Sequence, residues 1–316
     1  MRVAVCQIAP VFLDRVATVA KVAREVESAA AAGVKLIAFG EALVPGYPVW
    51  LGRTGGAAFD DPDQKRLFAR YAAEAVTIER GDLEPVQAAA RAGGITVVLG
   101  VVERPTDRGG HSLYCSCVVI AADGSIASCH RKLMPTYDER LVWSPGDGAG
   151  LVVHPLEEFT LGALNCWENW MPMARHALAA QGENLHVAIW PGSVHNTIDI
   201  TRFVAMEGRS WVLSASALLR PEDFPDDVPL RDAILADGEA VIHNGGSAIA
   251  RPDGMWAVEP APPEECRLET EVDLDAVRAA RQNFDSVGHY SRPDVLQLQV
   301  NRTRQSVAQF TDDPQS

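Results

Sequence analysis

The amino-acid sequence predicts an α/β protein in which helices cover layered β-sheets. Short apolar runs with strand character alternate with longer segments of helical periodicity along most of the 316-residue chain. Residues 113–132 and 244–260 each read as a β-hairpin, because an Asp-Gly turn separates two strand-like runs. This mixture of strand–helix units and hairpins favours layered sheets over a single, purely parallel sheet.

The first half of the chain is predicted to alternate between strands and helices. The segment that ends at residue 10 alternates like a strand, and Asp14 is a plausible N-cap for a helix that ends at Gly33. The apolar face of this helix is predicted to hold Val16, Val19, Ala20, Ala23 and Val26. Further strands are expected at 34–41 and 95–103, and further helices at 61–81 and 82–94.

The second half continues this alternation. Helices are predicted at 171–182 and 197–211, with strands at 184–192 and 212–219. Two stretches rich in Gly, Pro or Asp, residues 52–64 and 220–240, interrupt the pattern, and long loops of this kind often serve as lids or binding loops. We predict a single domain over residues 1–285. Residues 286–316 lack core-like periodicity, so we expect an arm that packs on the body or at a subunit interface.

Charge and composition exclude several classes of function. The 28 Lys and Arg residues against 42 Asp and Glu residues give a net charge of −14, which disfavours binding to nucleic acid or to an anionic membrane surface. No apolar run is long enough to span a bilayer, and no secretory signal is visible. The six cysteines are scattered, with no C-x-x-C pair and no zinc-like grouping with histidine. We therefore expect a reduced, cytoplasmic protein that uses no metal or other cofactor.

Cys166 is the first candidate for chemistry. It stands in "LGALNCWENWMP", where an apolar run ends at Asn165 and a helix is expected soon afterwards. A buried structural role is the default for a free cysteine. A cysteine between a strand end and a helix start, however, faces unpaired N–H groups, whose partial positive charge favours the reactive thiolate.

A carboxylate and an ammonium group occur at two further strand ends. Glu41 follows the apolar run of "LIAFGEALVPGYP", and Lys132 follows the strand-like "SIASCHRKLMPT". A thiol that attacks carbon needs a base, and the charge that develops needs a positive partner. Each group alone could be a strand terminus that emerges into solvent, but three reactive types at three strand ends indicate a site, because open α/β architectures build sites there.

These segments resemble the nitrilase branch of the carbon–nitrogen hydrolase superfamily. The blocks "GEALVPGYPVW", "HRKLMPTYDERLVWSPGDG" and "NCWENWMP" look like its three signatures, and "NGGSAIARPDG" and "VGHYSRPDVL" resemble further nitrilase segments in the same order. The resemblance implies a four-layer α-β-β-α sandwich and a Glu–Lys–Cys triad of Glu41, Lys132 and Cys166, with Glu139 as a second glutamate near the site. The first block departs slightly, since Gly40 and Ala42 flank the glutamate where many relatives carry a proline and a larger residue.

The resemblance also implies a reaction. Cys166 attacks a nitrile carbon while Glu41 accepts the thiol proton, Lys132 stabilises the nitrogen, and water then releases a carboxylic acid and ammonia. Aromatic residues near the blocks suggest an uncharged, apolar nitrile; the pocket residues we predict are Tyr47, Trp167, Trp170 and Trp190, with Trp50 and Trp143 nearby. Glu168 and His130 are expected to support the site without reacting.

Alternatives remain open at this point. The same triad could hydrolyse amides, or hydrate a nitrile and stop at the amide. A protein of another class, a nitrilase-like binding protein without turnover, would carry the same fold. Relatives share a dimer interface, so we expect a homodimer or a larger homo-oligomer.

Overall fold

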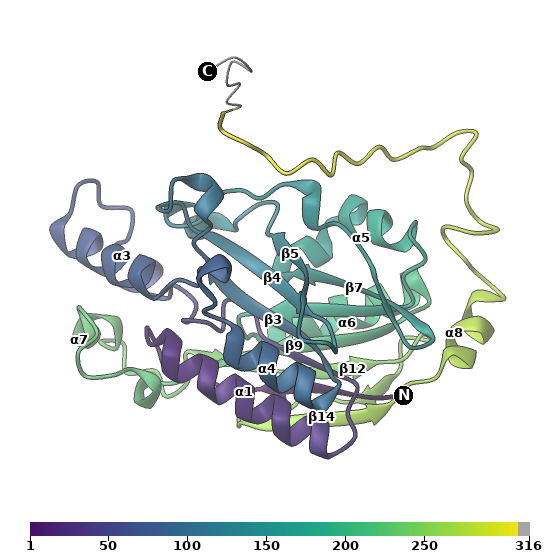
Figure 1. Ribbon diagram of the computed structural model, residues 1–316, viewed down its shortest axis with the longest axis horizontal. Coiled ribbons are helices and arrows are strands. Elements are labelled where there is room, and N and C mark those ends of the chain that lie inside the picture. The colour runs from purple at the N-terminus through teal and green to yellow at the C-terminus, as the bar shows by residue number, and fades with distance from the viewer. Residues whose placement is uncertain (309–316) are drawn as a thin grey trace, which may run out of the picture.

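The computed structural model describes residues 1–308 as two six-stranded sheets that pack face to face between two layers of helices (Figure 1). Apolar side chains of both sheets, such as Val5 and Val98 from the first and Leu161 and Leu213 from the second, form the central core. The predicted four-layer α-β-β-α sandwich is confirmed. Pairing of two sheets in this way buries the inner face of each strand, which explains the near-continuous apolar runs in the sequence.

The first sheet carries the N-terminal strands. Its order is β14 (Cys266–Glu271), β1 (Arg2–Gln7), β2 (Leu36–Phe39), β3 (Thr96–Glu103), β4 (Tyr114–Ile120) and β5 (Ile126–Arg131). Strands β1, β2 and β3 run parallel, and β4 and β5 form the predicted antiparallel hairpin. Helices α1 (Arg15–Ala31) and α4 (Glu84–Gly93) lie side by side over its outer face (Figure 1).

The second sheet carries the C-terminal strands. Its order is β13 (Trp256–Val258), β12 (Ala248–Ala250), β9 (Trp211–Ser216), β8 (Leu185–Trp190), β7 (Phe159–Asn165) and β6 (His154–Leu156). Strands β7, β8 and β9 are parallel, and β12 and β13 form the second predicted hairpin. Helices α5 (Pro172–Ala179) and α6 (Val194–Gly208) cover its outer face.

Helix α1 begins where the sequence predicts. The Asp14 side chain accepts a hydrogen bond from the Ala17 N–H at 2.9 Å, which satisfies one of the free donors at the helix start. The buried face, however, is centred on Val22, and Val16 is 69% exposed. At 100° per residue, Val16 lies roughly 120° around the helix from Val22 and therefore points away from the sheet.

The predicted helix over 61–81 is shorter in the structure. Helix α3 (Pro62–Glu74) ends because the chain turns extended at Ala75. The Val76 N–H then donates to the Val102 carbonyl at 2.8 Å, and Val76 pairs with Glu103 as an isolated parallel bridge beside β3. Pairing with a distant strand thus overrides a continuous helical pattern, which local periodicity cannot reveal.

Two elements in the C-terminal part were not predicted from the sequence. Strand β14 adds to the first sheet by antiparallel pairing with β1, and helix α8 (Leu274–Arg281) follows it. Strand β14 carries charged residues at alternate positions, so it lacks an apolar signature of its own. No helix in the described part of the chain is long and apolar enough to cross a membrane.

The two polar stretches lie against each other. Helix α2 (Trp50–Arg53) ends at Arg53, whose guanidinium donates to the Ile234 carbonyl at 3.2 Å and to Asp237 at 2.6 Å, and also binds Glu239. The stretch 220–240 contains helix α7 (Arg231–Ile234) and is closed at its base by pairing of β10 (Leu218–Leu219) with β11 (His243–Asn244). One cation therefore joins two loops that are far apart in the sequence.

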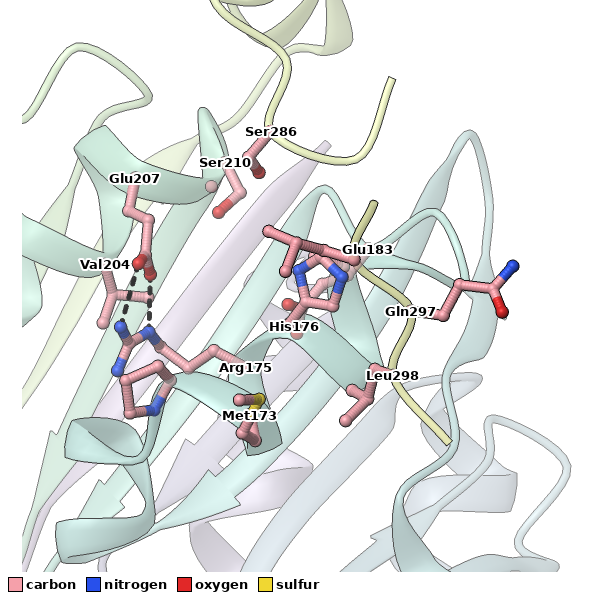
Figure 2. Close-up of a pocket in the computed structure, with 14 residues that line it drawn as sticks. Met173, Arg175, His176, Glu183, Val204, Glu207, Ser210, Ser286, Gln297 and Leu298 are labelled. Atoms are coloured by element: carbon pink, nitrogen blue, oxygen red, sulfur yellow. Dashed lines mark hydrogen bonds and ion pairs between the residues drawn. The ribbon is translucent and has the colours of Figure 1, made fainter. Parts of the chain in front are cut away.

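The chain after α8 runs as a long extended segment along the outside of the molecule (Figure 1). Leu298 packs beside Leu133 and Leu151 of the body, and Arg304 pairs with Asp147 at 3.1 Å. Beside α5 and α6 this segment borders a cavity of about 340 Å³, where Arg175 forms a two-pronged ion pair with Glu207 (Figure 2). Within the described residues, the arm therefore packs on the body of its own chain; the predicted end of the arm, residues 309–316, lies outside them.

Candidate active site

Cys166 lies where strand β7 ends. It is the first residue of a short 3₁₀ turn, η5 (Cys166–Trp170), which separates β7 from α5. Its φ of 42° is uncommon for a residue with a side chain, and such strained positions cluster at functional sites. The turn is held by Glu168, which accepts a hydrogen bond from the Asn165 N–H at 2.8 Å.

Glu41 and Lys132 meet in the buried space between the two sheets. Glu41 follows β2, and its N–H donates to the Trp190 carbonyl of the opposite sheet at 3.0 Å. Lys132 follows β5, and its Nζ lies 3.1 Å from Glu41 Oε1. Both side chains are fully buried, so each charge depends on the other for compensation.

Glu139 completes the cluster from a second 3₁₀ turn, η3 (Tyr137–Leu141). Its Oε2 accepts from Lys132 Nζ at 2.8 Å and from the Thr136 N–H at 2.6 Å, and its Oε1 accepts from the Tyr47 hydroxyl at 2.8 Å. The structure thus brings two carboxylates to one ammonium group. Lys132 is held by both, and the sequence-predicted residues Glu41, Lys132, Glu139 and Tyr47 form one connected network.

The charges of this cluster act on the thiol of Cys166. Burial, and then the Glu41 carboxylate, raise the pKa of Cys166 well above its ordinary value, although Lys132 opposes the shift. The resting thiolate that the sequence suggested is therefore not favoured. The reason is that desolvation and a nearby carboxylate outweigh the few N–H groups of a one-turn helix.

The base and the cation are shifted as well. Burial is the main cause that raises the pKa of Glu41 to about 8, with Lys132 acting against it and Glu139 adding to it. Burial lowers the pKa of Lys132, but the neighbouring Glu41, Cys166, Cys115 and Glu139 outweigh it, and the pKa lies well above its ordinary value. Lys132 therefore stays an ammonium group, while Glu41 exchanges a proton near neutral pH.

Cys166 lines a cavity of about 340 Å³. Its wall also includes Tyr47, Thr136, Glu139, Trp167 and Trp190, and the rest comes from residues 191–197 and 241–244. An enclosure of this size suits a small organic molecule. Among the described residues that form the wall, Glu139 alone carries a charged side chain, and it pairs with Lys132.

The amino-acid sequence is similar to those of known proteins over most of its length. Residues 2–282 match the Carbon-nitrogen hydrolase family. The chain belongs to this family. It is 36% identical over 305 residues to an aliphatic nitrilase of Sinorhizobium fredii, which covers 96% of this chain and 97% of that protein. It is 32% identical over 326 residues to a bifunctional nitrilase/nitrile hydratase of Nicotiana tabacum, which covers 98% of this chain and 89% of that protein.

The fold also matches solved structures. A carbon–nitrogen hydrolase from Helicobacter pylori superposes with a TM-score of 0.68 at 19% sequence identity, over 93% of this chain and 97% of that chain. At this identity the likeness concerns the fold alone. It agrees with the sandwich described above.

The glycine before Glu41 has a structural reason in this carbon–nitrogen hydrolase. A Cβ on Gly40 would lie 2.5 Å from the Ala217 nitrogen and 2.9 Å from the Trp190 carbonyl oxygen. The chain passes directly against the second sheet at this point. Only glycine allows that approach, and it delivers Glu41 into the space between the sheets.

Two of the predicted supporting residues, Glu168 and His130, lie beside the turn that carries Cys166. Glu168 accepts hydrogen bonds from His130 Nε2 at 3.0 Å and from the Leu133 N–H at 2.6 Å. Burial would raise the pKa of Glu168, but His130 and the backbone donors outweigh it and hold the pKa below its usual value. This carboxylate ties the turn that carries Cys166 to the strand end that carries Lys132.

Some predicted aromatic residues lie outside the cavity wall. Trp170 is 47% exposed and does not line the cavity. Its ring centroid lies 6.3 Å from that of Trp167, because residues three apart in a 3₁₀ turn share one side. Trp170 therefore sits one turn further from the cavity than Trp167. Trp50 packs against Tyr71 in the core, and Trp143 lies under Tyr47 with its ring 5.6 Å away. Trp50 and Trp143 are therefore buried supports of the site and do not border the space beside Cys166.

The wall segments 191–197 and 241–244 were missed by sequence reasoning. They contribute residues such as Asn196 and His243 that no motif singles out. The available signal was their position, since 241–244 directly follows the polar stretch 220–240. Among the residues that the structure describes, no group of three or more His, Cys, Asp or Glu could hold a metal ion.

Proposed function

We propose that this carbon–nitrogen hydrolase converts an organic nitrile to the carboxylic acid and ammonia through a covalent adduct on Cys166. The observation that carries the proposal is the buried cluster in which Lys132 Nζ lies 3.1 Å from Glu41 and 2.8 Å from Glu139, beside a cysteine that opens into a cavity. Named nitrilases at 36% and 32% identity over nearly the whole chain support the choice of a nitrile.

The roles of the residues follow from their chemistry. Glu41 accepts the thiol proton as the Cys166 sulfur bonds to the nitrile carbon, and the nitrogen that gains electrons takes up a proton to give a thioimidate. The Lys132 ammonium stabilises the negative charge that develops on that nitrogen. A pKa of about 8 suits Glu41 to this task, because a base near the working pH can both take and return a proton.

Two additions of water complete the reaction. The first water adds to the thioimidate carbon, and the tetrahedral intermediate loses ammonia to leave a thioester. The second water adds to the thioester, the C–S bond breaks, and the sulfur recovers its proton. Glu139 touches Lys132 directly, so we assign it to the positioning of that ammonium group.

Release of an amide is the second candidate outcome on the same triad. If the tetrahedral intermediate loses the cysteine sulfur before ammonia, the product is the amide. The similarity to the bifunctional nitrilase/nitrile hydratase of Nicotiana tabacum supports this second outcome. Both products would be measured together in the experiment below.

We propose that the substrate is uncharged. Tyr47, Trp167 and Trp190 give the cavity an aromatic wall, and the charge of Glu139 is balanced by Lys132. A charged nitrile would lose its hydration on entry and would find no unpaired counter-ion in the wall. Aromatic or branched neutral nitriles therefore fit the cavity best.

A nitrile panel tests the proposal. Purified protein and the Cys166→Ala variant are incubated with neutral aromatic, neutral aliphatic and charged nitriles, and ammonia, acid and amide are measured. We expect ammonia release from neutral nitriles by the wild type and none by the variant. Labelling of Cys166 by iodoacetamide without turnover of any nitrile or amide would instead identify a silent binding protein.

We also propose that a second copy of the chain is the partner. Helices α5 and α6 and the extended arm expose large apolar side chains, namely Met173 at 66%, Phe203 at 47% and Leu296 at 78%. Met173 and Leu296 border the same cavity, and Phe203 lies against Arg175 of that cavity. Figure 2 shows Met173 and Arg175 there. A contiguous apolar patch on a protein surface is typical of an interface.

A further inference from the structure

A second, much smaller cavity lies beside Glu41 and shares three of its lining residues with the cavity that Cys166 lines. Its volume is about 10 Å³, and Glu41, Tyr47, Pro191 and His243 border it together with apolar side chains such as Leu218. Glu41 borders this small cavity and not the large one that Cys166 lines. A space of roughly 10 Å³ holds about one water molecule, provided that polar partners are present.

One polar partner is the free oxygen of Glu41. Its Oε1 accepts from Lys132, whereas its Oε2 is buried and accepts no hydrogen bond within the described residues. A buried carboxylate oxygen without a donor is costly, and such atoms in native proteins are satisfied by another group or by water. The small cavity is the space available for that donor.

His243 supplies a second polar partner. Tyr47, Pro191 and His243 border both cavities, so they stand between the two. The Tyr47 hydroxyl already donates to Glu139, and Pro191 carries no side-chain donor or acceptor. Of these three residues, His243 alone has a ring nitrogen available.

The imidazole of His243 is neutral. Burial, and then Arg53, lower its pKa to about 4. A neutral imidazole carries its proton on one ring nitrogen, so the other nitrogen is an acceptor. Its ring lies 5.3 Å from the Tyr47 ring, which keeps it in place. Two acceptors, one on Glu41 and one on His243, match the two O–H groups of a water molecule.

We propose that this small cavity binds the water that hydrolyses the Cys166 adduct, and that His243 is the residue that positions it. The inference rests on the proposed function, since it needs a covalent adduct. The water donates one O–H to Glu41 Oε2 and the other to His243. Its oxygen forms the bond to the adduct carbon, its proton passes to Glu41, and after cleavage of the C–S bond Glu41 returns that proton to the sulfur.

Separate rates for attachment and release test the inference. Wild-type protein is mixed with one equivalent of a nitrile that the panel identifies as a substrate, and samples are quenched at intervals. Intact-protein mass spectrometry then measures the fraction of protein that carries an adduct on Cys166. In His243→Phe, which keeps a ring but removes both nitrogens, we expect release to slow far more than attachment, because only release needs the positioned water. Release should slow by roughly 100-fold, so that the adduct accumulates, because a misplaced reactant loses about that factor.

Two further variants make the result specific. His243→Asn keeps a polar side chain that can accept from water, and we expect it to release the adduct faster than His243→Phe. His111→Phe is the matched control, because His111 is exposed and borders neither cavity. Circular dichroism and thermal unfolding establish that each variant is folded, and if His243→Phe is not, the comparison rests on His243→Asn, which should then release more slowly than wild type.

The outcomes separate this inference from the proposed function. If wild type forms no adduct with any nitrile or amide, the proposed function fails. If wild type turns over while the His243 variants release the adduct at the wild-type rate, the function stands and the water site is wrong. Equal losses of attachment and release in the His243 variants would likewise overturn the positioning role, because a general loss of structure has that effect.

Discussion

At the scale of single residues, the site depends on charges that are buried together. Lys132 is fully buried between Glu41 and Glu139, so one ammonium group faces two carboxylates away from bulk solvent. Removal of one member of such a cluster leaves the others without compensation and is strongly destabilising. Burial raises the pKa of Glu41 to about 8 although Lys132 opposes it, whereas the neighbouring carboxylates and thiols raise the pKa of Lys132 and keep it an ammonium group.

The first prediction concerns the pH dependence of catalysis. Glu41 accepts a proton only when ionised, and burial raises its pKa from 4.5 to about 8. We therefore expect kcat/KM for a neutral nitrile to rise with pH through about 8. A flat profile from pH 6 to 9 would contradict Glu41 as the base. The same shift affects stability. The folded chain holds the Glu41 proton more tightly than the unfolded chain, so the contribution of this carboxyl to the free energy of unfolding is lost as pH rises from 4.5 to 8.

The second prediction concerns Glu139. Glu139→Gln removes the negative charge 2.8 Å from Lys132 Nζ but keeps the shape of the side chain. We expect kcat to fall by about 100-fold or more with a small change in KM, because the ammonium group that meets the reacting nitrogen is no longer held in place. Steady-state kinetics on the best nitrile of the panel give both values.

Two related variants bracket this result. Tyr47→Phe removes one hydrogen bond to Glu139, and we expect a smaller loss of about tenfold. Asp138→Asn is the control, since Asp138 lies on the same turn and forms no ion pair with Lys132. Equal activity of Glu139→Gln and Asp138→Asn would contradict the role of Glu139 in positioning Lys132.

At the scale of elements, sequence patterns predict the strand ends that carry the reactive residues, but they do not predict the segments that form the cavity wall. Glu41, Lys132 and Cys166 each follow a short apolar run, and local patterns identify such runs well. The wall residues of 191–197 span a loop and the first turn of α6, and those of 241–244 span a loop and β11. These distant segments meet only after the two sheets have packed. Their position therefore depends on tertiary structure that no local pattern contains.

The loop over 220–240 gives the third prediction. Arg53 binds the Ile234 carbonyl, Asp237 and Glu239, directly before the residues that form the cavity wall. We expect Arg53→Ala to raise KM severalfold and to speed trypsin cleavage at Arg231, because the loop loses its main polar anchor. Arg66→Ala is the matched control, because Arg66 is exposed and pairs only with Asp63 on its own helix. Identical proteolysis of the two variants would contradict an anchoring role for Arg53.

At the scale of the whole molecule, long-range pairing accounts for what sequence reasoning missed. Strand β14 pairs with β1 although more than 250 residues separate them, and Val76 leaves its helical pattern to pair beside β3. The apolar runs predicted layered sheets covered by helices, because both sheets bury their inner faces. The four-layer arrangement was implied by the family resemblance. Edge strands and irregular segments carry weaker patterns, since only part of their surface is buried.

The assembly of the molecule gives the fourth prediction. The apolar patch of α5, α6 and the arm includes Phe203, which is half exposed and lies over Arg175. A charge placed there would have to be desolvated when a second copy covers the patch, so we expect Phe203→Asp to shift the protein from dimer or larger oligomer toward monomer. Size-exclusion chromatography with light scattering at micromolar concentration measures the mass directly. Phe59→Asp is the control, because Phe59 is fully exposed on the stretch 52–64 and lies outside the patch. The interface would be contradicted if the wild-type protein were monomeric under these conditions. It would also be contradicted if both variants had the same mass as wild type.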